Sequence, residues 1–93
     1  MEFEFESEIV EWRGPAPFYF APTPSDVTAE IDQFSGELSY GWGCIPAKVR
    51  IGKTEITTAL IPKAGSYYVP LKKVIREPNQ LEVGSRVKIR LSL

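Results

Sequence analysis

The sequence contains no histidine and a single cysteine, Cys44. Without histidine, the chain lacks the commonest general base and the commonest zinc ligand of proteins. One thiol cannot form an internal disulfide or a multi-cysteine metal site, which favours a reducing compartment. The acidic N-terminus lacks the basic and apolar segments of a secretory signal, and no apolar run approaches the roughly 20 residues of a membrane span. We therefore expect a cytoplasmic protein without a membrane segment, a metal site or a cofactor.

The composition is that of a soluble globular domain, but the charges are divided unevenly along the chain. Hydrophobic residues account for 43% of the 93 positions and charged residues for 25%, which predicts one domain over residues 1–93. Residues 1–45 hold nine acidic residues and one basic residue, whereas residues 46–93 hold ten basic and three acidic residues. This division is typical of a basic binding face, or of two halves that pair with each other. The alternation of acidic and basic residues along the expected strands favours the pairing.

The first half of the chain has three segments with the pattern of β-strands. Residues 2–12 alternate apolar and acidic side chains as far as Glu8, and a bulge or bend is expected beyond that point. The aromatic residues 18–20 form a short second strand. Residues 45–51 alternate again, with apolar side chains facing inward and two basic side chains facing outward.

A helix is expected between the second and third of these strands. Thr23 has the position of an N-cap, with a proline at the first helical position and an aspartate three residues after the cap. Gly36 is expected to end the helix, and residues 37–43 to form a loop. The predicted buried stripe consists of Val27, Ile31 and Phe34.

The second half of the chain has the same order of elements. Gly52-Lys53 has the pattern of a hairpin turn with glycine first, and it precedes a strand over residues 54–61. A short strand over residues 66–69 leads to Pro70, which is expected to start a helix that Pro78 ends. The buried face predicted for this helix is Leu71, Val74 and Ile75. The residues expected to face inward on the final strand are Val87, Ile89, Leu91 and Leu93.

Together these elements predict a mainly β fold made of two pseudo-repeated β-β-α-β halves. Six short strands and two short helices in a chain of this length favour a small closed barrel, because closure removes the unpaired edges of a sheet. We expect the glutamate-rich first strand to lie beside the final strand, which is rich in arginine and lysine. Exposed cross-strand ion pairs would then help to select the neighbour and the register.

Two families resemble parts of this sequence. Residues 68–76 and 81–89 resemble one half of the AbrB/MazE swapped-hairpin barrel, with Ser85 where that family usually has aspartate. Four segments carry a second resemblance: Phe18-Tyr19-Phe20 with Pro22, Gly41-Trp42-Gly43-Cys44-Ile45-Pro46, residues 51–62 and Pro70-Leu71-Lys72-Lys73 with Arg76. Through them nearly the whole chain resembles the domain of unknown function 1905 family, in which a serine is more usual at the position of Cys44. The resemblance to this second family implies a double-split β-barrel. It implies no activity, because none is established for the family.

Four residues are candidates for binding a ligand. Trp42 lies between two glycines, where it could stack on a ligand or plug one end of the barrel. Lys72 and Arg76 are spaced to share one helix face, where they could hold a phosphate or a carboxylate, pair with the acidic half or remain solvated. Thr58 is the fourth candidate, although β propensity also explains its place in a strand. Cys44 is expected to be a small, partly buried residue.

We therefore interpret the chain as a small β-barrel binding or accessory module with an anion or small-ligand site near the Gly-Trp-Gly loop. A small anionic ligand or a protein partner is compatible with this interpretation, and we expect a monomer or a weak homodimer. The alternative is an AbrB-like nucleic-acid-binding protein, a transcription regulator or antitoxin, whose basic strand at residues 86–90 would contact phosphates. Nucleic acid is the less favoured partner, because the acidic half would repel it. We expect no catalytic residue, since the acidic side chains lie on a solvent-facing surface.

Overall fold

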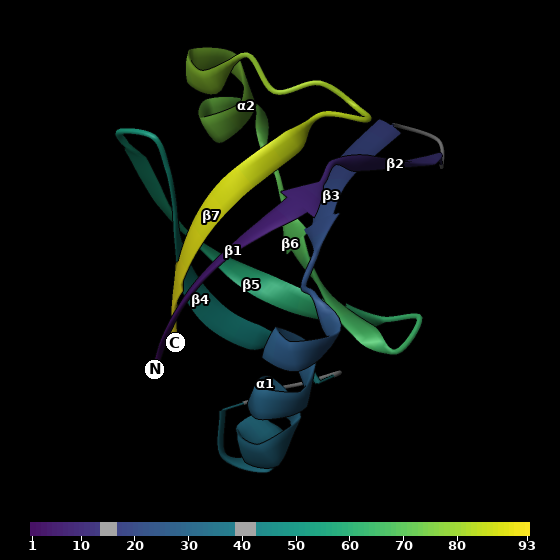
Figure 1. Cartoon of the computed structure of the whole chain (residues 1–93), viewed down its shortest axis with the longest axis vertical. Helices are drawn as coiled ribbons and strands as arrows, with labels where there is room; N and C mark the ends of the chain where they lie inside the picture. Colours follow the sequence, from purple (N-terminus) through teal and green to yellow (C-terminus); the bar gives the residue numbers. More distant parts are fainter. Residues whose placement is uncertain (14–16, 39–42) are drawn as a thin grey trace.

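The described residues form a curled antiparallel sheet of seven strands with two helices. The computed structural model describes residues 1–13, 17–38 and 43–93 (Figure 1). Neighbouring strands are antiparallel and follow the order β1-β7-β4-β5-β6-β3-β2 across the sheet. The strands are β1 (Glu2–Glu8), β2 (Val10–Arg13), β3 (Pro17–Pro22), β4 (Ile45–Ile51), β5 (Thr54–Lys63), β6 (Ser66–Pro70) and β7 (Arg86–Ser92). The helices are α1 (Ser25–Leu38) and α2 (Lys73–Asn79).

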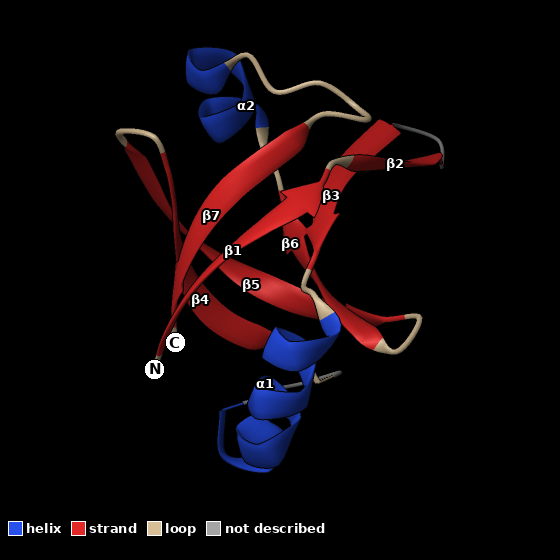
Figure 2. Ribbon diagram, in the orientation of Figure 1, coloured by secondary structure: helices blue, strands red, loops and turns tan. Residues whose placement is uncertain are grey.

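The sheet curls into a half-barrel, so that strands far apart in its order approach each other (Figure 2). Ser7 in β1 donates a hydrogen bond from Oγ to the carbonyl oxygen of Pro22 in β3, at 2.6 Å. The two termini lie side by side, since Leu93 N donates to Met1 O at 2.8 Å. The predicted mainly β fold with two β-β-α-β halves is confirmed. The prediction of a closed six-stranded barrel is wrong, because the sheet has seven strands and its end strands, β1 and β2, do not pair with each other among the described residues. The first half differs only in that its first strand is broken into β1 and β2.

The bend expected beyond Glu8 occurs at Ile9, between β1 and β2. Ile9 N donates to Ser85 O at 2.9 Å, and Ile9 O accepts a hydrogen bond from Gly84 N at 2.8 Å. The turn that precedes β7 therefore satisfies the backbone at the break. Beyond Ile9 the chain leaves β7 and pairs with β3 as β2.

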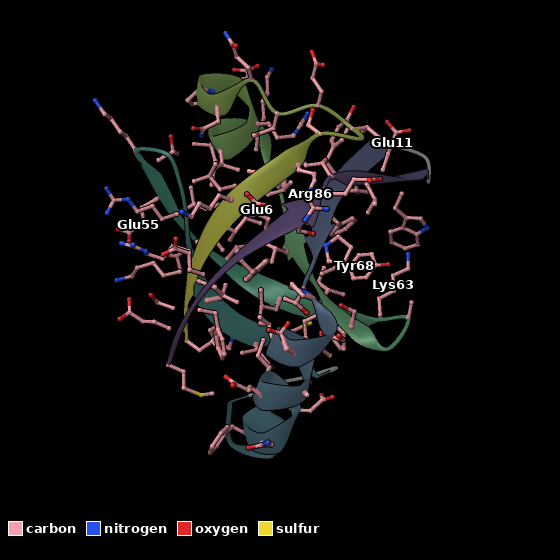
Figure 3. The ribbon with its side chains drawn as sticks, in the orientation of Figure 1. Glu6, Glu11, Glu55, Lys63, Tyr68 and Arg86 are labelled. Carbon is pink, nitrogen blue, oxygen red and sulfur yellow. The ribbon has the colours of Figure 1, made fainter. Side chains whose placement is uncertain are left out.

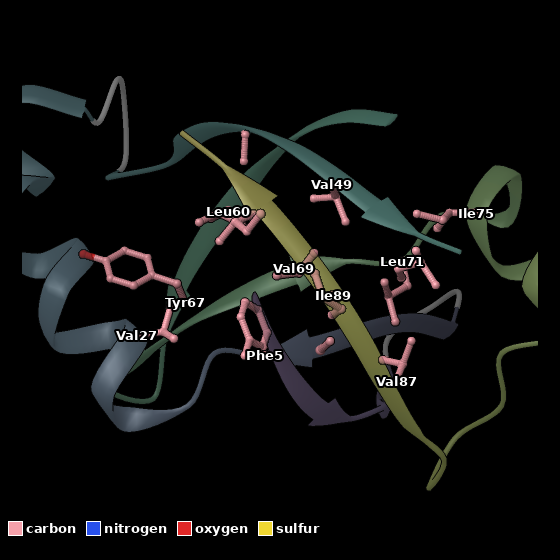
Figure 4. Packing of buried hydrophobic residues seen from close by; sticks show 14 of the residues in the cluster. Phe5, Val27, Val49, Leu60, Tyr67, Val69, Leu71, Ile75, Val87 and Ile89 are labelled. Carbon is pink, nitrogen blue, oxygen red and sulfur yellow. The ribbon is translucent and has the colours of Figure 1, made fainter. Parts of the chain in front are cut away.

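The hydrophobic core lies inside the curl of the sheet (Figure 4). β4 and β7 alternate buried and exposed residues, as their sequences predict. Complete burial of an aliphatic side chain stabilises the fold by about 1.5–3 kcal/mol, so these residues supply much of the driving force for folding. The largest fully buried side chains are Ile9, Ile31, Ile45, Leu60, Ile75, Ile89, Leu91, Val49 and Val69.

The predicted pairing of the glutamate-rich and the basic strands is confirmed by β1 and β7. Glu4 lies 2.8 Å from Lys88 Nζ and 3.2 Å from Arg90 Nη2. Glu6 lies 3.8 Å from Arg86, on the same side of the sheet (Figure 3). Hydrogen bonds from Lys88 and then Arg90 lower the pKa of the Glu4 carboxyl, and the hydrogen bond to Glu4 raises the pKa of the Lys88 ammonium. The ion pairs are exposed, so they help to set the register more than they add stability.

Helix α1 differs from the prediction at both ends. It begins at Ser25, and the Thr23 hydroxyl does not cap it but contacts the Thr28 hydroxyl at 2.7 Å. The helix does not end at Gly36, as predicted, but continues through this exposed glycine to Leu38. The prediction that Phe34 is buried is wrong, since the residue is 41% exposed. Val27 and Ile31 are buried, but the later turns of α1 extend beyond the sheet (Figure 1).

Helix α2 also differs from the prediction. Pro70 does not start it, because Pro70 pairs with Phe20 as the last residue of β6. The helix begins at Lys73, contains Pro78 and ends at Asn79, and the C-cap residue Gln80 has a φ of 52°. Val74 is 59% exposed and so does not belong to the buried face. The short helix rests on the core through one buried residue, Ile75.

Candidate functional site

A cavity of about 820 Å³ opens where β5 and β6 separate. These strands pair only between Ile61–Lys63 and Ser66–Tyr68. Away from that segment β5 remains paired with β4, whereas β6 pairs with β3. The separation leaves a space between β5 and the junction of β6 with α2. The residues that line it are Trp12, Phe18, Tyr19, Phe20, Cys44, Thr58, Ala59, Ile61, Pro70, Leu71, Lys72, Lys73 and Arg76.

Aromatic side chains from β2 and β3 form one wall of the cavity. Trp12 and Phe18 are cross-strand partners, and they are 53% and 51% exposed. The Trp12 ring also lies 6.4 Å from the ring of Phe20, centroid to centroid. Lys63 Nζ lies 3.4 Å from the centroid of the Trp12 ring and 5.8 Å from that of Tyr68. Figure 3 shows Lys63 and Tyr68 projecting from β5 and β6 toward the same side of the molecule. The cation–π contact covers one face of the Trp12 ring and helps to orient it.

The guanidinium of Arg76 is held by contacts with two other lining residues of the cavity, Tyr19 and Leu71. Its guanidinium carbon lies 4.1 Å from the centroid of the Tyr19 ring. Its Nε donates a hydrogen bond to the carbonyl oxygen of Leu71 at 2.9 Å. Among the residues that the structure describes, Arg76 forms no ion pair with a carboxylate. The stacking and the Nε hydrogen bond thus fix the plane of the guanidinium, and its terminal amino groups remain for a further acceptor.

Two lysines add positive charge beside Arg76. Lys72 is the N-cap residue of α2, and within the described part of the chain its ammonium has no carboxylate partner. Lys73 Nζ lies 3.5 Å from Glu77 one turn further along the helix, but both side chains are largely exposed. An exposed ion pair of this kind contributes little to stability. The described lining residues thus include three cations and no carboxylate.

Three of the four residues predicted as ligand-binding line this cavity. Thr58 comes from β5, Lys72 from the start of α2 and Arg76 from the second turn of α2. The fourth, Trp42, lies outside the described residues. Cys44, half-buried as expected from the sequence, also contributes to the lining. The fold therefore brings the three predicted residues together, although Thr58 and Arg76 are 18 positions apart in the sequence.

The aromatic wall was not predicted from the sequence. Trp12, Phe18 and Tyr19 were assigned to strands, but no role in a site was inferred for them. The signal that identifies Trp12 and Phe18 is the register of the β2–β3 pair, which sets them directly opposite each other and so on one face of the sheet. Alternation places Tyr19 on the other face, where its ring contacts Arg76.

The described part of the chain consists of residues 1–13, 17–38 and 43–93. In these segments no three cysteine, aspartate or glutamate side chains gather in a way that could hold a metal ion. The same segments contain no helix with the length and apolar character needed to cross a membrane.

Comparison with known proteins relates the chain to one family. Residues 5–91 match the family model described as "Domain of unknown function (DUF1905)", in agreement with the resemblance inferred from the sequence. The resemblance to AbrB/MazE proteins is not confirmed. No curated protein matches the chain.

Proposed function

The chain belongs to the DUF1905 family, and from that premise we propose that it is a binding module that holds a small anionic ligand in the cavity between β5 and α2. The family description names no activity, so the proposal depends on the chemistry of the cavity. Its volume of about 820 Å³ lies in the range of small-molecule sites. A mostly apolar space with a few convergent polar groups is the usual form of such a site.

The observation that carries the proposal is the separation of two kinds of side chain around the cavity. Aromatic residues of β2 and β3 form one wall, and the cations Lys72, Lys73 and Arg76 come from α2 and the residue before it. Because the described lining includes no carboxylate, these cations would attract a negatively charged ligand. The apolar wall would bury the remainder of that ligand.

Binding is a better interpretation of this lining than catalysis. The described lining residues include one thiol and two hydroxyl groups, those of Cys44, Thr58 and Tyr19, but no carboxylate or imidazole that could act as their general base. We therefore expect binding without chemical turnover.

A nucleic-acid-binding role is the weaker proposal. It requires the basic strand β7 to contact phosphates, but Lys88 and Arg90 are paired with Glu4, and Arg86 is paired with Glu6. A phosphate backbone would have to displace these carboxylates and would also meet the other glutamates of β1.

Calorimetric titration with small anions tests the proposed function. The panel contains phosphate, acetate, octanoate and 2-naphthoate, and each is also tested for stabilisation against thermal unfolding. A ligand at 100 times its Kd should stabilise the protein by about 2.7 kcal/mol. We expect at least one anion of the panel to bind.

A charge-matched pair of variants locates the binding. The double variant Lys72→Gln/Lys73→Gln removes two charges from the cavity, and Lys48→Gln/Lys53→Gln removes two exposed charges outside it. The first should weaken binding, and the second should leave it unchanged. The proposed function is wrong if no anion of the panel binds, or if both double variants weaken binding equally.

A further inference from the structure

We infer that the ligand has a planar aromatic body with one carboxylate or phosphate group, and that Arg76 is the residue that selects that group. This inference rests on the proposed function, because it defines the ligand class of the same cavity. It combines two features of the described residues: a guanidinium that is already oriented, and half-exposed aromatic rings in the same lining.

Arg76 is suited to paired hydrogen bonding with an anion. The Tyr19 ring supports one face of the guanidinium at 4.1 Å, and the Leu71 carbonyl accepts from Nε at 2.9 Å. Both contacts hold the group in place without using its two terminal amino groups. Carboxylates and phosphates present two oxygens at the spacing of these donors. Because the side chain is already ordered, binding loses less conformational entropy than it would with a free arginine.

The two lysines beside Arg76 cannot provide the same selectivity. Lys72 and Lys73 are exposed point charges on flexible stems. They would raise the local concentration of any anion. Only the planar guanidinium discriminates by geometry, so replacement of Arg76 by lysine should reduce affinity although the charge is retained.

The aromatic wall indicates the shape of the remainder of the ligand. Trp12 and Phe18 are each about half exposed in the cavity lining, and large exposed rings are favourable surfaces for stacking. Lys63 already covers one face of the Trp12 ring, at 3.4 Å from its centroid. A cavity of about 820 Å³ is also much larger than a bare inorganic anion requires. A flat aromatic body would gain ring–ring contacts that an aliphatic chain of similar size would not.

Isothermal titration calorimetry with four probes tests this inference. 2-Naphthoate and 2-naphthyl phosphate carry the proposed anionic groups on an aromatic body, 2-naphthol lacks a charge, and octanoate lacks a ring. We expect both naphthyl anions to bind, with 2-naphthol and octanoate each weaker by about tenfold or more. The comparison of the two naphthyl anions shows which anionic group is preferred.

Arg76→Lys is the central variant, and Arg50→Lys is its matched control. Arg50 lies outside the cavity, and its Nε donates to the carbonyl oxygen of Gly52 at 3.3 Å, so it is also an arginine bound to the backbone. Arg76→Lys should weaken 2-naphthoate by about tenfold or more, whereas Arg50→Lys should have no effect. Circular dichroism and thermal unfolding of each variant show whether its fold is retained.

Trp12→Leu provides an independent measurement. This variant keeps an apolar wall but removes a ring, so it should weaken 2-naphthoate and leave octanoate unchanged. Octanoate binding as tightly as 2-naphthoate, or full affinity in Arg76→Lys, would overturn the inference while the proposed anion site stands. Failure of all the anionic probes to bind would overturn both.

Discussion

Replacement of Gly52 by alanine should destabilise the protein through two effects that can be separated. Gly52 begins the turn between β4 and β5 and has a φ of 59°. A Cβ at this position would lie 2.6 Å from Asn79 Oδ1, at the end of α2. Asn79 Nδ2 donates to Thr54 Oγ1 at 3.2 Å and to Ile75 O at 2.9 Å. An alanine at position 52 would therefore be strained at this positive φ. Its methyl group would also displace the Asn79 side chain, which links α2 to β5.

The size of the effect follows from these contacts. A left-handed backbone costs a residue with a Cβ about 1–2 kcal/mol. Displacement of Asn79 loses two hydrogen bonds worth about 0.5–1.5 kcal/mol each. Gly52→Ala should thus lower the free energy of unfolding by about 2–5 kcal/mol. In an Asn79→Ala background only the backbone effect remains, and the cost should fall to about 1–2 kcal/mol.

Urea denaturation of the four proteins of this double-mutant cycle measures both costs. The free energies are compared only among variants with the same m-value, because a different m-value would indicate a changed unfolded state. Equal costs of Gly52→Ala in the two backgrounds would refute the contact with Asn79. A cost below about 0.5 kcal/mol in the native background would also refute the strain expected at a positive φ.

Two further predictions concern the charged strands and helix α1. The ionised Glu4 carboxyl, whose pKa is lowered from 4.5 by the cations of β7, contributes stability that is present above that pH and is lost as the pH falls through its folded-state pKa. The urea midpoint of the native protein should therefore decline more steeply below pH 4.5 than that of Glu4→Gln, and parallel profiles would contradict this account. Ile31→Ala should cost about 2–5 kcal/mol, because the side chain is fully buried. Phe34→Ala should cost less than about 1 kcal/mol, because that residue is 41% exposed, and similar losses of thermal stability in the two variants would contradict the packing of α1.

Most of the strands could be predicted because their signals are local. In β4 and β7 every second residue is apolar, and the sheet buries those residues on one side. The turn at Gly52-Lys53 was predictable because glycine can adopt a positive φ at no steric cost. The neighbours β1 and β7 could be inferred from opposite charges, although they lie at opposite ends of the sequence.

The helices were predicted less well because their ends depend on packing. Phe34 has the right spacing for a buried stripe, but the sheet does not reach the turn in which it lies. Pro70 has the pattern of a first helical residue, but the pairing of β6 with β3 holds it in a strand. In each case a tertiary contact, or the lack of one, decided between two conformations that the local sequence allows.

The sequence by itself determined which strand residues face the core and which residues carry the cationic part of the candidate site, because alternation and charge are properties of single segments. Charge and helical spacing led to Lys72 and Arg76 in this way. Only the tertiary structure decided that β5 and β6 separate after three paired residues, and that the aromatic residues of β2 and β3 complete the cavity formed there. Both features depend on the curvature of the whole sheet and on pairings between distant strands, which no single segment of the sequence determines.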